Sequence, residues 1–121
     1  MKSYVGVDLS KRSIAAVRLV DGKVEQRYTG ATTKKELEKF ALWLRDEDTV
    51  AIETGSNAIY FIDTIRSFTS AKIIVLDPRR LVMIYKSLKK NDQEDALKIA
   101  RLISVFKEEE LPTVYVPEKQ E

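Results

Sequence analysis

The sequence contains neither cysteine nor histidine among its 121 residues. Without cysteine there can be no disulfide, no thiolate zinc site and no thiol nucleophile. Without histidine the chain lacks the commonest general base and the commonest ligand of transition metals. Catalysis, if there is any, has to use carboxylates, lysine, tyrosine, serine or a hard metal ion.

Other absences narrow the class of protein further. The chain shows no signal peptide and no apolar run long enough to span a membrane, so we expect a cytoplasmic protein without membrane contacts. It has no G-x-G-x-x-G and no phosphate-binding G-x-x-x-x-G-K-[ST] motif, so nucleotide binding of those kinds is unsupported. The net charge is only +2, which by itself does not decide for or against nucleic acid. With 44% hydrophobic residues, the length suits one folded domain.

Three strand-like runs open the sequence, at residues 3–8, 14–20 and 23–29. Asp21-Gly22 stands between the second and the third and is a strong hairpin signal, because both turn positions need a positive φ. In the third run we expect charged residues on one face and Val24 and Tyr28 on the other, the charged ones being Lys23, Glu25 and Arg27. This alternation predicts an edge strand with one solvent-facing side.

Helices and short strands alternate after residue 32. Thr33 and Glu36 are spaced as a capping box, and Asp77-Pro78 as an N-cap followed by the first helical residue. Buried strands are expected at 50–53 and 72–76. Apolar residues recur at helical spacing in four segments, the last of which runs from about 92 to 106: Leu37, Phe40, Ala41 and Leu44; Ala58, Phe61, Ile62 and Ile65; Leu81, Ile84, Tyr85 and Leu88; Ala96, Ile99, Ala100 and Ile103.

The resulting order, β-β-β-α-β-α-β-α-α, predicts an α/β domain over residues 1–106. Because crossovers between parallel strands are right-handed, we expect a mixed five-stranded sheet in the order 3-2-1-4-5, flanked by helices, with strand 3 antiparallel at an edge. A Rossmann domain is disfavoured, since it needs a helix after its first strand. Residues 107–121 are expected to form an extended exit segment and a polar tail.

Four acids are candidate metal ligands. Asp8 ends the first strand and Glu53 the fourth, and strand ends of this kind gather at one sheet edge, where two carboxylates would repel each other without a cation. Asp92 and Asp95 are three residues apart on the apolar face of the last helix, so we expect them on its buried side. Four carboxylates without histidine or cysteine favour Mg²⁺ or Mn²⁺, and we expect two ions.

Each acid also has a plainer interpretation. Asp92 could be a helix N-cap, with Asp95 in the first turn favoured by the helix dipole. Glu53 could be a solvated strand end, and Asp8 a turn residue ahead of Ser10. Asp77 is assigned to capping.

Basic residues cluster in segment 78–91, which has five of them and no acid. With Lys11, which is expected near the acids, they are candidates for nucleic-acid binding: Arg79, Arg80, Lys86, Lys89 and Lys90. An ordinary solvated helix face, a solvated turn for Lys11 and a surface for a protein partner remain alternatives. Ser56 is interpreted as a helix cap rather than a nucleophile.

Four segments resemble the N-terminal domain of the DEDD transposases, the insertion-sequence family that also contains the Piv-type DNA invertases. They are VGVDLSK at 5–11, AIETGSNAIY at 51–60, LDPRRL at 76–81 and KNDQEDALKIARL at 90–102, and they occur in the family's order over nearly the whole chain. The resemblance implies a RuvC-like fold of the RNase H superfamily and metal-dependent DNA strand cleavage and transfer. Matched position by position, the family's tetrad falls on Asp8, Glu53, Asp92 and Asp95. One departure is Gly55-Ser56-Asn57, where members usually show Gly-Gly or Gly-x-Tyr after the glutamate.

The resemblance also implies features that this chain would not contain. Members continue into a second domain whose serine attacks DNA, so we expect the isolated chain to have little or no cleavage activity. DNA, a structured guide RNA and further copies in a homo-oligomer are the implied partners. Two other classes remain open: a non-catalytic binding or dimerisation module, and one half of an actin- or sugar-kinase-like ATPase, although Ser10 stands where those proteins favour glycine.

Overall fold

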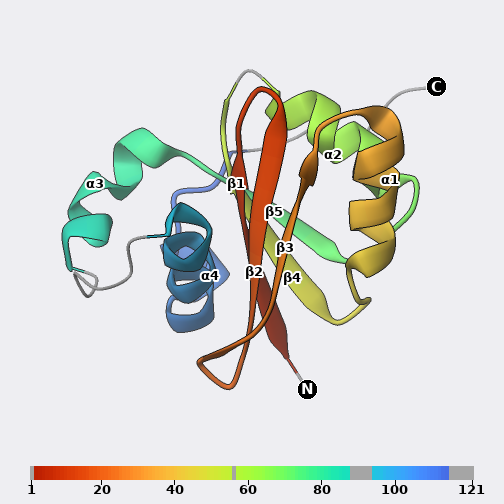
Figure 1. Ribbon diagram of the computed structural model, residues 1–121. Helices are drawn as coiled ribbons and strands as arrows, with labels where there is room; N and C mark the ends of the chain where they lie inside the picture. The colour runs from red at the N-terminus through yellow and green to blue at the C-terminus, as the bar shows by residue number, and fades with distance from the viewer. Residues whose placement is uncertain (1, 56, 88–93, 115–121) are drawn as a thin grey trace.

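The computed structural model describes residues 2–55, 57–87 and 94–114, which form an α/β domain around one five-stranded mixed sheet (Figure 1). The strand order is β3-β2-β1-β4-β5, which confirms the predicted order. β1 pairs antiparallel with β2 and parallel with β4, and β3 is the antiparallel edge strand. The elements in chain order are β1 Ser3–Leu9, β2 Ser13–Val20, β3 Lys23–Ala31, α1 Lys34–Trp43, β4 Asp48–Glu53, α2 Ala58–Arg66, β5 Lys72–Leu76, α3 Pro78–Ser87, α4 Asp95–Val105 and the 3-10 helix η1 Glu108–Glu110.

The sheet lies between two helical layers, with α1 and α2 on one face and α4 and α3 on the other (Figure 1). Val7 of β1 and Ile52 of β4 belong to the core beneath α1 and α2, whereas Ala51 packs with residues of α4. Since successive residues of a strand point to opposite faces, Asp8 and Glu53 project to the α4 side. The topology therefore brings both acids to the same edge and the same face.

The predicted helix starts and apolar faces are largely confirmed. The Thr33 Oγ1 accepts a hydrogen bond from the Glu36 backbone N–H at 3.4 Å, and the Asp77 Oδ1 accepts one from the Arg79 N–H at 3.0 Å. All the apolar residues predicted to face the core from α1, α2 and α4 are buried, as is Leu81 of α3. Leu88 lies outside the described residues, and the environment of the Tyr85 side chain is not described.

The hairpin turn between β2 and β3 is also confirmed, with positive φ values of 53° at Asp21 and 76° at Gly22. The predicted alternation of β3 is wrong, however. The β2–β3 register shifts so that Glu25 is an extra residue on β3, and such a bulge reverses the alternation of side chains. Val24 therefore packs on the α4 side, Tyr28 on the α1 side, and the charged residue Arg27 faces α4.

Two further expectations on burial are corrected by the structure. Asp95 is exposed rather than on the buried side, because it is the first residue of α4 and precedes Ala96, which is buried against the sheet. Asp92, the other acid expected on that face, lies outside the described residues. Lys72 in the predicted buried strand is exposed, since β5 lies at the other end of the strand order.

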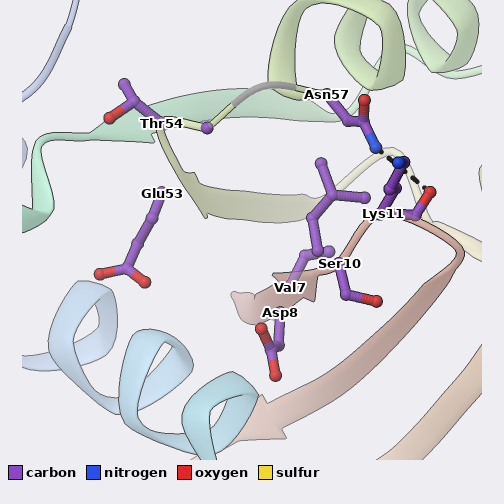
Figure 2. A pocket seen from close by; sticks show the side chains of 9 residues that line it. Val7, Asp8, Ser10, Lys11, Glu53, Thr54 and Asn57 are labelled. Atoms are coloured by element: carbon purple, nitrogen blue, oxygen red, sulfur yellow. Dashed lines mark hydrogen bonds between the residues drawn. The ribbon is translucent and has the colours of Figure 1, made fainter.

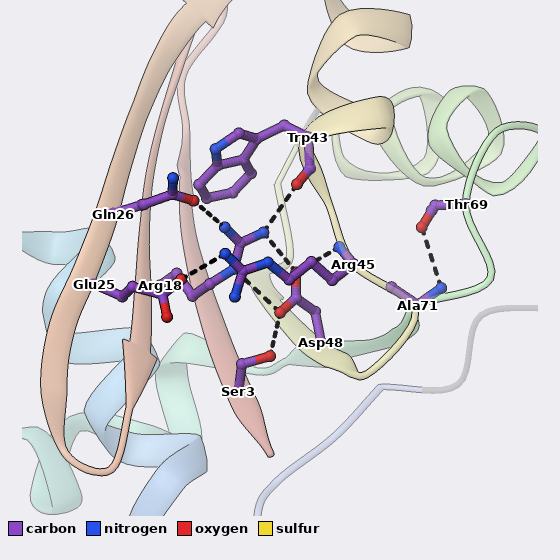
Figure 3. A network of polar contacts seen from close by, with 9 residues as sticks. All are labelled: Ser3, Arg18, Glu25, Gln26, Trp43, Arg45, Asp48, Thr69 and Ala71. Carbon is purple, nitrogen blue, oxygen red and sulfur yellow. Dashed lines mark hydrogen bonds and ion pairs between the residues drawn. The ribbon is translucent and has the colours of Figure 1, made fainter. Parts of the chain in front are cut away.

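A buried ion pair joins β2 to the start of β4 at the end of the sheet opposite Asp8 (Figure 3). The Arg18 Nη2 lies 2.8 Å from the Asp48 Oδ2, and the guanidinium carbon is 3.9 Å from the centre of the Trp43 ring. Burial raises the pKa of Asp48, but hydrogen bonds from Arg18, the Arg45 backbone and Ser3 outweigh it and leave that pKa below its usual value. Both charges therefore have partners, and removing one of them would leave the other as an unpaired charge in the core.

The segment after α4 returns to the edge of β5. Thr113 forms an isolated antiparallel bridge with Leu76, and the Val114 N–H donates to the Val75 carbonyl at 2.8 Å. Within the described ranges, no helix has the length and apolar character needed to cross a membrane.

Gly6 sets the distance between β1 and α4. A Cβ at this position would lie 2.1 Å from the Ala96 carbonyl oxygen and 2.4 Å from the Ala100 nitrogen. Both obstacles are backbone atoms of α4, so no side-chain rotation could relieve the clash. Only glycine lets the helix backbone lie directly on the strand here.

We expect Gly6→Ala to destabilise the domain by about 3 kcal/mol, at the upper end of what overpacking usually costs, because α4 has to move away from the sheet. Urea unfolding followed by circular dichroism would measure the loss. Gly55→Ala is the matched control, since a Cβ at Gly55 meets no atom within 4 Å. Equal free energies of unfolding for the two variants would contradict the role assigned to Gly6.

Candidate functional site

A cavity of about 200 Å³ opens at the edge of the sheet where β1 and β4 end (Figure 2). Asp8 and Glu53 line it with Lys11 from the β1–β2 turn, and the carboxylates of the two acids point toward α4 (Figure 2). The two acids come from adjacent parallel strands, which is why residues far apart in the sequence line one cavity. The cavity therefore combines two predicted metal ligands with one predicted phosphate-binding residue.

Hydrogen bonds hold the turns that form the walls of this cavity. The Lys11 carbonyl accepts a bond from the Thr32 Oγ1 at 3.0 Å and one from the Asn57 Nδ2 at 3.2 Å. The Ser10 N–H donates to the Ser13 carbonyl at 2.9 Å, which closes the β1–β2 turn. The backbone on either side of the cavity is thus tied together.

The pKa of the Asp8 carboxyl is raised above its usual value. Partial burial raises its pKa, and the negative charge of Asp95 raises it further. The side chain keeps a large exposed fraction, so water still screens part of both effects. The structure therefore couples Asp8 electrostatically to the start of α4.

The predicted tetrad is brought together in part. Asp8 and Glu53 line one cavity, Asp95 acts on Asp8, and Asp92 lies outside the described residues. Within residues 2–55, 57–87 and 94–114, no three acidic side chains form a group able to hold a metal ion. What the described part of the chain supplies is a pair of carboxylates and a third acid nearby.

The predicted basic residues lie in two places. Lys11 lines the cavity, while Arg79, Arg80 and Lys86 are exposed on α3. α3 follows β5, which runs parallel to β4, so it leaves the sheet from the edge that carries the acids. The other two predicted basic residues, Lys89 and Lys90, lie outside the described residues, as does Ser56.

Sequence reasoning missed one contact beside the acids. Arg27 of β3 binds Glu94, the residue before α4, through two hydrogen bonds of 2.8 and 3.2 Å. Simple alternation along β3 predicts Arg27 on the same face as Glu25. The bulge that changes this leaves no clear mark in the sequence. The acidic side chain of Glu94 indicates that an ion pair is possible, but nothing in the neighbouring sequence identifies Arg27 as its partner.

No protein-family model matches this sequence, and the search of curated proteins finds no match. The chemistry of the cavity and the motif resemblance are therefore the features that bear on function.

The raised pKa of Asp8 predicts how its removal changes stability with pH. Above that pKa the folded state bears the cost of the charged carboxylate, and below about 3.9, the usual Asp value, both states are protonated and the cost disappears. Metal-free Asp8→Asn should therefore be more stable than wild type at pH 7, by less than about 1 kcal/mol because water screens the site. The gain should vanish as the pH falls below about 3.9.

Chemical unfolding in chelator at pH 7 and pH 3 would measure this difference. Asp63→Asn, on α2 across the sheet, controls for the general loss of one negative charge. A variant at Asp8 that is less stable than wild type at both pH values would contradict the prediction.

Proposed function

We propose that this chain is the catalytic domain of an RNase H-like DNA recombinase or transposase that binds divalent metal ions. The observation that carries the proposal is the cavity that Asp8 and Glu53 line from adjacent strands, with the charge of Asp95 acting on Asp8. The motif resemblance supports the same class of protein. It also supplies the substrate class, the phosphodiesters of DNA.

The donor set fits Mg²⁺ or Mn²⁺, since it consists of carboxylate oxygens without nitrogen or sulfur. Asp8 and Glu53 would hold the ion, with Asp95 and the resemblance-implied Asp92 completing the set. Burial and the negative charge of Asp95 raise the pKa of Asp8, and a bound cation would relieve the cost of its charged form. Two bound ions would supply charge stabilisation at the scissile phosphate and a more acidic attacking oxygen.

The chain's own basic residues would hold the DNA backbone. Lys11 lies in the cavity wall, where the fixed backbone of its turn limits where its side chain can reach. Arg79, Arg80 and Lys86 are exposed on the helix that leaves the same edge of the sheet. Phosphates bound on α3 would place the strand beside the acids, and Lys89 and Lys90 remain candidates from the sequence for the same role.

We expect Mn²⁺ to stabilise the folded protein through Asp8. At a hundredfold excess over its dissociation constant, one ion should add about 2.7 kcal/mol, or roughly 5–10 °C in Tm. Asp8→Asn should lose this shift, and the control Asp63→Asn should keep it. Thermal melts with and without Mn²⁺ give the comparison. Equal shifts in wild type and Asp8→Asn would overturn Asp8 as a ligand.

DNA binding should depend on α3. Replacing Arg79, Arg80 and Lys86 with alanine should weaken duplex binding and reduce the slope of log K against log salt by about 0.9 for each lost phosphate contact. Fluorescence anisotropy over a salt series would measure both effects. The triple variant Lys34→Ala, Lys35→Ala, Lys39→Ala on α1 is a control of equal charge change across the sheet. An equal change of slope in both triple variants would remove α3 from the proposal.

The same preparations distinguish the other classes. Because the resemblance assigns the nucleophile to a second domain, the purified chain should nick plasmid DNA weakly or not at all in Mg²⁺. Robust nicking that requires Asp8 would show that the nucleophile of a second domain is unnecessary. Stabilisation by ATP without any effect of DNA would instead favour the ATPase alternative.

A further inference from the structure

Within the part of the chain that the structure describes, the helix that carries Asp95 begins without a side-chain cap. Glu94 occupies the N-cap position of α4, yet its side chain makes no capping hydrogen bond to the helix. The first turn of any helix has backbone N–H groups without partners in the helix, and a cap normally satisfies some of them. The Glu94 carboxylate instead binds Arg27 on β3, with Nη2–Oε1 at 2.8 Å and Nε–Oε2 at 3.2 Å.

We propose that the Arg27–Glu94 ion pair positions Asp95 relative to Asp8 and thereby sets the affinity of the site for divalent cations. This inference rests on the proposed function, since it concerns the same acids. Arg27 and Glu94 would act as positioning residues. The pair acts through the backbone, because Glu94 directly precedes Asp95.

Within the described residues, the other attachments of α4 lie at Ala96 and further along the helix, on the C-terminal side of Asp95. Gly6 packs against the helix backbone at Ala96 and Ala100, and the Arg101 Nη1 donates to the Gly22 carbonyl at 3.1 Å. Asp95 lies on the N-terminal side of all these contacts, where the helix has its weakest internal hydrogen bonding. A bidentate pair fixes both position and orientation, which a single contact would not do.

The sign of the effect separates positioning from simple electrostatics. If electrostatics alone mattered, removing the positive charge of Arg27 would let the nearby acids attract a cation more strongly. Loss of positioning has the opposite consequence, because the Asp95 oxygens are then held less often where an ion can bind them. Arg27→Ala is therefore the decisive variant, whereas neutralising Glu94 would weaken cation binding under either account.

Mn²⁺ titration by calorimetry or electron paramagnetic resonance would test the inference. We expect Arg27→Ala to weaken Mn²⁺ binding roughly three- to tenfold, in keeping with the modest strength of exposed ion pairs. Arg27→Lys should lie between this variant and wild type, since it keeps the charge but loses the bidentate geometry. In an Asp95→Asn background, Arg27→Ala should have no further effect.

Arg45→Ala is the matched control. It breaks the Arg45–Glu25 pair, which also attaches β3 to another part of the fold, with an Nη2–Oε1 distance of 2.7 Å and side chains of similar exposure. It should leave Mn²⁺ affinity within twofold of wild type. Unchanged or tighter Mn²⁺ binding by Arg27→Ala would overturn the inference.

Amide hydrogen exchange without metal tests the positioning step by itself. Exchange at residues 95–98 should be faster in Arg27→Ala than in wild type and Arg45→Ala, and equal exchange in all three would overturn the positioning role. If wild type binds no Mn²⁺, the proposed metal site fails. The exchange comparison then decides separately whether the ion pair fixes the start of α4.

Discussion

The direct contact between β1 and the backbone of α4 at Gly6 determines how the sheet and this helix meet at the site. The missing Cβ lets the helix lie on the strand, where any side chain would meet the Ala96 carbonyl oxygen or the Ala100 nitrogen. Asp8 is two residues beyond Gly6 and so lies on the same face, while Asp95 directly precedes Ala96. A single close approach therefore brings two of the candidate ligands near each other.

The pKa values of the buried or partly buried acids at the two ends of the sheet are shifted in opposite directions. At one end Asp48 receives hydrogen bonds from Arg18, Arg45 and Ser3, which lower its pKa despite burial (Figure 3). At the other end partial burial and the negative charge of Asp95 raise the pKa of Asp8. A buried pair such as Arg18–Asp48 contributes orientation more than net stability, because desolvation offsets much of its attraction. Asp48 already has a cationic partner in Arg18, so a cation bound as proposed would act at the end near Asp8.

The fold was predictable wherever a local pattern carried the information. Asp21-Gly22 forms the expected hairpin turn, Thr33 caps α1, and the apolar faces of α1, α2 and α4 are all buried. The strand order followed from the order of these elements and the handedness of crossovers. Of the candidate site, the meeting of Asp8 and Glu53 could be anticipated because both end strands that were expected to be parallel neighbours.

Other features depended on interactions between distant parts of the chain. The bulge at Glu25 turns Arg27 toward α4, and the exposure of Asp95 follows from where α4 begins in the described chain. Neither the pairing of Arg27 with Glu94 nor that of Arg18 with Asp48 could be read from spacing, because each joins residues on different elements. The sequence by itself determined which elements form and in what order the strands lie, since propensity, capping and alternation act over a few neighbouring residues. Only the tertiary structure decided which charges face each other, because the distance between two charged side chains is set by how whole elements pack.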